Sequence, residues 1–137
     1  MEMNFENVNW LAILACVVFG QGFLTVWFVV IFAKPWAKEY GVGDPREHTK
    51  AIPGFTYGIG ALCVLLLSLG LSVVQSALGV SSLGDGLLFG IVVAVCFSIT
   101  TAVPGYIFLR RYRALGLAMG AQTVLVVVLS TVLAVWR

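Results

Sequence analysis

Four long apolar runs without any charged residue dominate this sequence. They cover residues 8–32, about 55–78, about 86–109 and about 115–136. A helix needs about 20 mostly apolar residues to cross the roughly 30 Å hydrocarbon core of a membrane. The strands of a membrane barrel alternate in polarity over about ten residues, which these runs do not. The pattern therefore predicts four membrane-spanning helices.

The amino-acid composition excludes the other common classes of protein. Apolar residues make up 61% of the chain and charged residues 10%, against about 45–50% and about 25% in typical globular domains. Disordered chains have low hydrophobicity, and a net charge of +2 is too small to indicate a nucleic-acid partner. We expect an all-α integral membrane four-helix bundle of antiparallel hairpins, with residues 1–137 forming a single transmembrane domain.

The charged residues all lie outside the apolar runs. Glu2 and Glu6 precede the first run, Asp85 lies in the second connection, and Arg137 ends the chain. The first and third connections hold the remaining basic residues, which are Lys34, Lys38, Arg46, Lys50, Arg110, Arg111 and Arg113. Basic residues that flank membrane helices stay in the cytoplasm. This distribution predicts a multi-pass protein of the bacterial cytoplasmic (inner) membrane, with both termini outside.

The first connection begins with a segment that is typical of an interfacial helix. Over residues 32–41, Pro35 suits a first helical turn, Trp36 and Tyr40 are one turn apart, and Gly41 can end the helix. Membrane lipids are the expected partner of the basic residues beside it and in the third connection, because anionic lipids attract basic side chains by about 1 kcal/mol each. These lipid-facing residues are Lys34, Lys38, Arg110, Arg111 and Arg113.

Small residues predict where helices pack closely. Lipid is as apolar as leucine, so membrane helices associate through small residues and hydrogen bonds rather than through apolar burial. Two glycine pairs have four-residue spacing, Gly86 with Gly90 and Gly116 with Gly120. They indicate contacts within one chain or between subunits, and we expect a homo-oligomer or a larger membrane-protein partner.

Uncharged polar residues form one edge on each predicted helix. Ser68, Ser72, Gln75 and Ser76 follow helical spacing in the second run, and Ser130 continues an edge in the fourth. Five polar residues fall near the middle of the membrane by depth: Gln21, Ser68, Ser98, Thr101 and Gln122. This polar belt has two interpretations, which are hydrogen bonds between helices and the lining of a cavity or narrow pore.

Pro104 lies inside the third run. A proline within a helix removes one backbone donor and clashes with the carbonyl four residues earlier, here that of Thr100. We expect a kink near Pro104, with the hydroxyls of Thr100 and Thr101 satisfying the freed backbone groups.

The sequence offers no catalytic, metal-binding or cofactor-binding constellation. Cys16, Cys63 and Cys96 lie inside the apolar runs without a paired motif, and we interpret them as small buried residues. His48 stands alone in the first connection, where a solvated loop is expected. No Asp, Glu, Lys, Arg or His lies within a run, which disfavours proton-coupled transport. We therefore expect a protein that is not an enzyme.

Several short motifs resemble a known family of small bacterial four-helix membrane proteins, the domain of unknown function 1761. The matching segments are Val8-Asn9-Trp10-Leu11-Ala12, Trp27 followed by Phe32-Ala33-Lys34-Pro35-Trp36, the basic turn at 110–113, and Val132-Leu133-Ala134-Val135-Trp136-Arg137. The family often has Gly-Tyr-His where this chain has Ala121-Gln122-Thr123. The resemblance implies the four-span architecture and supplies no activity.

Two functions remain open at the level of the sequence. The first is a non-enzymatic structural or accessory role for a self-associating helical bundle, which needs only the glycine pairs and the polar edges. The alternative is a channel or carrier for a neutral or weakly charged small solute, which would use the polar belt.

Overall fold

The computed structural model describes residues 8–136, and within that range the chain is helical and contains no strand. The helices, in chain order, are α1 (Trp10–Thr25), η1 (Val26–Ile31), α2 (Ala33–Glu39), α3 (Pro45–Ala51), α4 (Gly54–Leu78), α5 (Leu83–Val93), η2 (Ala94–Ile99), α6 (Thr100–Phe108) and α7 (Tyr112–Val135). The expected all-helical fold is confirmed. Glu2, Glu6 and Arg137, on which the topology argument also drew, lie outside the described residues.

Within residues 8–136, four helical segments are long and apolar enough to cross a membrane. They are α1 with η1 (Trp10–Ile31), α4 (Gly54–Leu78), α5 with η2 and α6 (Leu83–Phe108), and α7 (Tyr112–Val135). Their ends lie within three residues of those predicted from the apolar runs. The limits of the spans therefore follow from hydropathy and from the position of the first charged or turn-forming residue.

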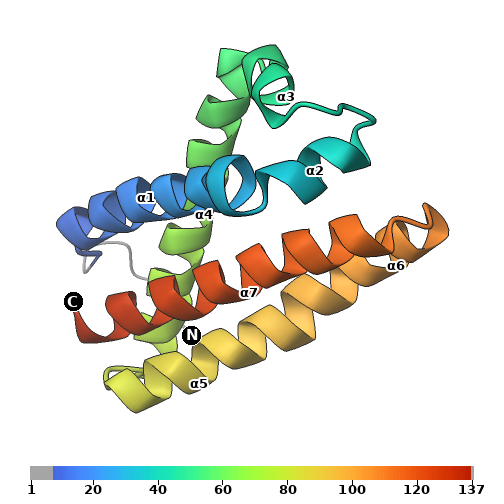
Figure 1. The fold of residues 1–137 in the computed structure, drawn as a ribbon. Coiled ribbons are helices and arrows are strands. Elements are labelled where there is room, and N and C mark those ends of the chain that lie inside the picture. Colours follow the sequence, from blue (N-terminus) through green and yellow to red (C-terminus); the bar gives the residue numbers. More distant parts are fainter. Residues whose placement is uncertain (1–7, 137) are drawn as a thin grey trace.

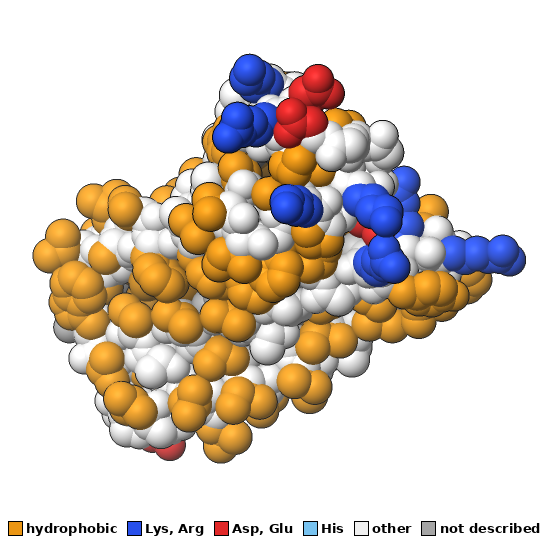
Figure 2. All heavy atoms as spheres, in the orientation of Figure 1, with side chains coloured by type: hydrophobic (Ala, Val, Ile, Leu, Met, Phe, Trp, Pro, Cys, Tyr) orange, Lys and Arg blue, Asp and Glu red, His pale blue; other side chains and the backbone are white. Residues whose placement is uncertain are grey.

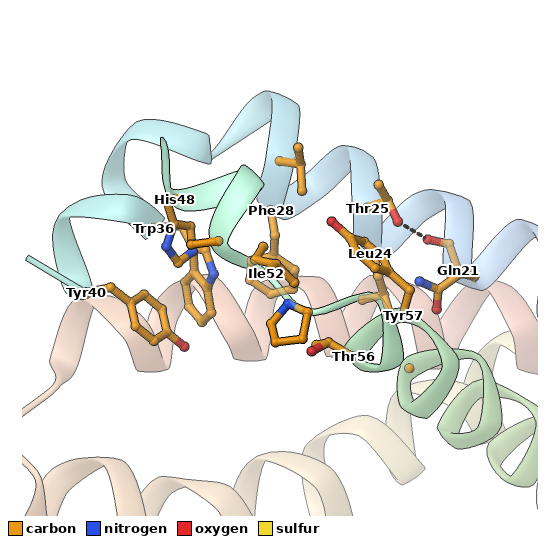
Figure 3. A pocket seen from close by; sticks show the side chains of 14 residues that line it. Gln21, Leu24, Thr25, Phe28, Trp36, Tyr40, His48, Ile52, Thr56 and Tyr57 are labelled. Carbon is orange, nitrogen blue, oxygen red and sulfur yellow. Dashed lines mark hydrogen bonds between the residues drawn. The ribbon is translucent and has the colours of Figure 1, made fainter. Parts of the chain in front are cut away.

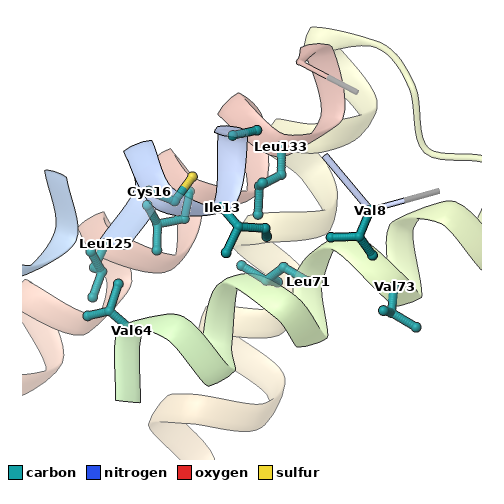
Figure 4. Packing of buried hydrophobic residues seen from close by; sticks show 10 residues of the cluster. Val8, Ile13, Cys16, Val64, Leu71, Val73, Leu125 and Leu133 are labelled. Atoms are coloured by element: carbon teal, nitrogen blue, oxygen red, sulfur yellow. The ribbon is translucent and has the colours of Figure 1, made fainter. Parts of the chain in front are cut away.

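The fourth span, α7, is the central helix of the fold. It contacts α1, α4, α5 and η2, and Figure 1 shows it between α1 and α5. α4 crosses α1 and α7 at a steep angle in that view, and its main contacts are with these two helices. The buried apolar cluster lies where the three helices meet, with Ile13 from α1, Val64 from α4, and Leu125 and Leu129 from α7 (Figure 4).

The glycine pair at the start of the third span brings two helix backbones into contact. A Cβ added to Gly86 would lie 2.5 Å from Ala134 Cβ, and one added to Gly90 would lie 2.9 Å from Val127 Cα. These distances leave no room for any side chain, so α5 approaches α7 as closely as the absence of a Cβ allows.

The second glycine pair is placed differently. Gly116 has no atom within 4 Å of its added Cβ, and Gly120 is covered by the ring of Trp27, at 3.2 Å. Trp27 Nε1 also donates a hydrogen bond to Leu117 O at 3.1 Å. Here a tryptophan from η1, and not the backbone of a second helix, occupies the surface of α7.

Two of the spans contain a π-helical segment, η1 in the first and η2 in the third. Threonine hydroxyls accompany them. Thr25 Oγ1 donates to Gln21 O at 2.8 Å, Thr100 Oγ1 to Cys96 O at 2.6 Å, and Thr101 Oγ1 to Phe97 O at 2.6 Å. Threonines commonly bond the carbonyl four residues earlier in this way.

The expected role of these threonines near Pro104 was wrong. Pro104 lies within α6, and the carbonyl that its ring displaces is that of Thr100. The two hydroxyls instead bond carbonyls of η2. The reason is geometric, because a threonine side chain on a helix reaches back towards its own preceding turn and not to the carbonyl of its own residue.

The first and third connections lie at the same end of the structure. A hollow of about 290 Å³ is lined jointly by Trp36 of α2, Tyr40 just after it, Tyr106 of α6 and Arg111 of the α6–α7 turn. Figure 2 shows the Lys and Arg side chains gathered at this end, with acidic side chains among them, and one acidic side chain at the opposite end. The predicted topology requires this arrangement.

The short helix expected at the start of the first connection is present as α2. Trp36 of this helix and Tyr40, which follows its last residue, pack edge to face at 5.5 Å between ring centroids. The helix ends at Glu39, and Gly41 adopts φ +73, a left-handed conformation that terminates helices and favours glycine. The first connection also forms α3, which the sequence did not predict.

Candidate functional site

A cavity of about 460 Å³ lies between α1 with η1, α2, α3 and the first turns of α4 (Figure 3). It reaches from the first connection to Gln21, half-way along the first span. Its lining includes no Lys, Arg, Asp or Glu. Buried charges need partners in a low-dielectric site, so a lining without charge suits a neutral ligand.

Gln21 forms the inner end of this cavity. Its Oε1 atom is buried and accepts no hydrogen bond from any residue that the structure describes. The oxygen lies beside Gly60 of α4, where an added Cβ would be only 2.9 Å from it. Figure 3 shows the amide nitrogen on the cavity side. Gly60 therefore makes room for an amide that presents one hydrogen-bonding atom to the cavity.

Aromatic side chains form a continuous wall from the first span to the first connection. Phe28 packs on Trp36 with ring centroids 4.5 Å apart, Trp36 on Tyr40 at 5.5 Å, and Tyr40 stacks on His48 at 4.8 Å. Each of these four residues lines the cavity. The ring contacts hold the short helices α2 and α3 against the membrane spans, so the first connection closes one side of the cavity.

The position of His48 corrects the expectation of a solvated loop. Asp44 caps α3 by accepting a hydrogen bond from Arg46 N at 2.9 Å, and Pro45 occupies the first helical position. The helix places His48 half-buried against Tyr40. The signal was present in the sequence as an Asp-Pro pair, which is a common start of a helix.

The residues of the predicted polar belt lie in different surroundings. Gln21 lines the cavity, whereas Ser68 is fully buried and donates to Val64 O of its own helix at 2.8 Å. Thr101 is exposed on α6, and Ser98 and Gln122 are half-buried. The number of residues from the end of each run predicted that all five side chains lie at one height in the membrane. In the structure, the side chains point in different directions around their helix axes.

A buried hydrogen-bond network links three of the four spans. Gln75 Nε2 of α4 donates to Ser130 O and Ser130 Oγ of α7, both at 2.8 Å. Ser130 Oγ in turn donates to Gly86 O of α5 at 2.6 Å. Both polar side chains have no exposed surface. The sequence showed Gln75 and Ser130 on polar edges, but it did not indicate that they meet.

The remaining reactive residues form no site of their own. Cys16 is buried as expected, but Cys63 and Cys96 are exposed on the outer faces of their helices, which corrects the expectation for these two. Among residues 8–136, no three His, Cys, Asp or Glu side chains are grouped to hold a metal ion. The five predicted lipid-facing basic residues are all exposed.

Comparisons with known proteins give a family and no activity. A family model described as "Protein of unknown function (DUF1761)" matches residues 11–134. No curated protein matches the chain, and no solved structure does.

Proposed function

The chain belongs to the DUF1761 family of proteins of unknown function, and from that premise we propose that it is a non-enzymatic membrane protein with a structural or accessory role. The proposal includes self-association or assembly with a larger membrane protein. Its four apolar helices are compatible with a multi-pass protein. The close α5–α7 contact and the buried network support a rigid scaffold.

The observation that carries the proposal is that only a small share of each span is buried by other parts of the same chain. In the most apolar part of each span, the buried share is 17% in the first and third, 22% in the second and 39% in α7. The uncovered surface is available to lipid or to other membrane helices. Membrane helices associate through close packing, and the uncovered Gly54 and Gly58 on α4 leave room for such contact.

The proposed orientation places the first and third connections in the cytoplasm of a bacterial cell and both termini outside. The gathering of the basic residues at one end supports this orientation (Figure 2), because basic flanking residues are retained on the cytoplasmic side. The exposed Lys34, Lys38, Arg110, Arg111 and Arg113 would then contact anionic lipid head groups.

The mass of the purified protein in mild detergent tests the assembly. We expect a mass that is a multiple of the 14.7 kDa chain, or a stable complex with a larger membrane protein. The measurement should be repeated in lipid nanodiscs at several protein-to-lipid ratios. A monodisperse 14.7 kDa species under all of these conditions would contradict the accessory proposal.

The cavity at Gln21 favours a second candidate, a carrier for a neutral or weakly charged small solute. Single cysteines at Gln21, Ser98 and Gln122, in a chain whose native cysteines are replaced, distinguish the two functions. We expect a water-soluble thiol reagent to label Gln21→Cys but not Ser98→Cys or Gln122→Cys, since Gln21 alone among these three lines the cavity. Labelling of all three would indicate a continuous wet path and favour the carrier.

A further inference from the structure

We infer that the cavity between the first connection and α4 binds a neutral compound with a planar ring that carries a carbonyl group. The inference goes beyond the proposed accessory role and does not depend on it. The volume of about 460 Å³ lies within the range of roughly 300–1,000 Å³ that is typical of small-molecule sites.

The polarity of the cavity sets the charge of the ligand. Its lining has no charged Lys, Arg, Asp or Glu side chain, while several basic residues lie nearby on the same end of the molecule. A desolvated cation would find no Asp or Glu in the lining to pair with, and a desolvated anion would find no Lys or Arg. A neutral molecule meets neither cost.

The unpaired amide of Gln21 sets the polar group of the ligand. An amide N–H that is left without a hydrogen-bond acceptor where water is excluded is costly. The buried Oε1 of Gln21 is turned towards Gly60, whereas the amide nitrogen faces the cavity and donates no hydrogen bond to any described residue. A ligand carbonyl placed at the inner end would accept a hydrogen bond from this nitrogen.

The aromatic wall sets the shape of the ligand. Phe28, Trp36 and Tyr57 line the cavity between Gln21 and the first connection. Aromatic rings pair with planar rings in offset or edge-to-face geometry and gain about 0.5–1.5 kcal/mol beyond the burial of area. A flat ring therefore fits this wall better than a flexible chain does.

A binding measurement with the whole protein in nanodiscs tests the inference. The probes are duroquinone, a ring with two carbonyls and no tail, and decylubiquinone, which adds an apolar tail; decanol provides a tail without a ring. We expect saturable binding of one ring compound per chain above the signal of empty nanodiscs. Binding of duroquinone would show that the ring with its carbonyls is sufficient, and binding of decylubiquinone alone would show that the ligand also needs an apolar tail.

Two matched pairs of variants locate the site. We expect Gln21→Leu to weaken binding about fivefold, which is the loss of one hydrogen bond, and Gln122→Leu to leave it unchanged. Gly60→Ala should also weaken binding, because its Cβ would push the Gln21 amide out of place, whereas Gly58→Ala has open space.

The thermal stability of each variant, measured without ligand, separates a local loss of binding from unfolding. Absence of saturable ring binding by the wild-type protein would overturn the inference, and so would equal binding of decanol. Equal losses in Gln21→Leu and Gln122→Leu would overturn the assigned location.

Discussion

A Gly90→Leu variant is expected to lose the packed α5–α7 pair and to unfold at temperatures where the wild-type protein is intact. The leucine side chain would start 2.9 Å from Val127 Cα and from Ser130 Cβ. Overpacking usually costs about 1–3 kcal/mol, and the cost is expected to exceed about 3 kcal/mol here because helix backbone cannot move aside as a side chain can. Unfolding of the purified protein in detergent, followed by circular dichroism, measures the change.

Gly116→Leu is the matched control for this prediction. It introduces the same side chain on an apolar helix, but at a position with no atom within 4 Å of the added Cβ. Its effect on the free energy of unfolding is expected to stay within about 0.5 kcal/mol, as for most surface substitutions. Similar losses of stability in the two variants would contradict the prediction. They would show that a larger side chain at the α5–α7 contact costs no more than one at an uncovered position of an apolar helix.

The sequence could predict the features that depend on hydropathy along the chain. Each span ends close to a charge or a turn residue, as at Gly79, which adopts φ +69 after α4. The short helix α2 was predictable for the same reason, because Gly41 follows Trp36 and Tyr40 at the required spacing. These signals are local, so they need no knowledge of which helices are neighbours.

The sequence could not show which of the two glycine pairs joins two helices. Both have the same four-residue spacing, and the difference depends on what each faces. Gly90 faces the backbone of α7, whereas Gly120 faces the ring of Trp27, which lies more than 90 residues away in sequence. A π-helical segment places Trp27 there, and no simple composition signal marks such segments.

The candidate site was predictable only in part, because the sequence does not show which way a side chain faces on its helix. Depth along a span gave an expected height for Gln21 in the membrane, but it gave no direction around the helix axis. The cavity also depends on α3 and on the stacking of Tyr40 with His48, which fold the first connection back against the spans. Long-range contacts of this kind are set by the tertiary structure.

Removing the buried network between three spans is the second change with a large expected effect. Gln75→Leu deletes the two hydrogen bonds to Ser130, and Ser130→Ala deletes the bond to Gly86 O and leaves Gln75 with one acceptor. Single hydrogen bonds between membrane helices average about 0.6 kcal/mol, and a buried donor left without its partner costs about 1–3 kcal/mol. We expect Ser130→Ala to lose about 2 kcal/mol of stability, because one N–H of Gln75 is left without its partner. Gln75→Leu should lose about 1 kcal/mol, since it also removes the buried Gln75 Oε1, which has no partner among the described residues.

A double-mutant cycle separates the network from the packing of the two side chains. If Gln75 and Ser130 act as one unit, the loss in the double variant is smaller than the sum of the single losses by about 1 kcal/mol. Ser76→Ala is the control, since Ser76 follows Gln75 on α4 but is exposed. Additive losses would show that the two residues stabilise α4 and α7 independently, and that the shared hydrogen bonds do not hold the three spans together.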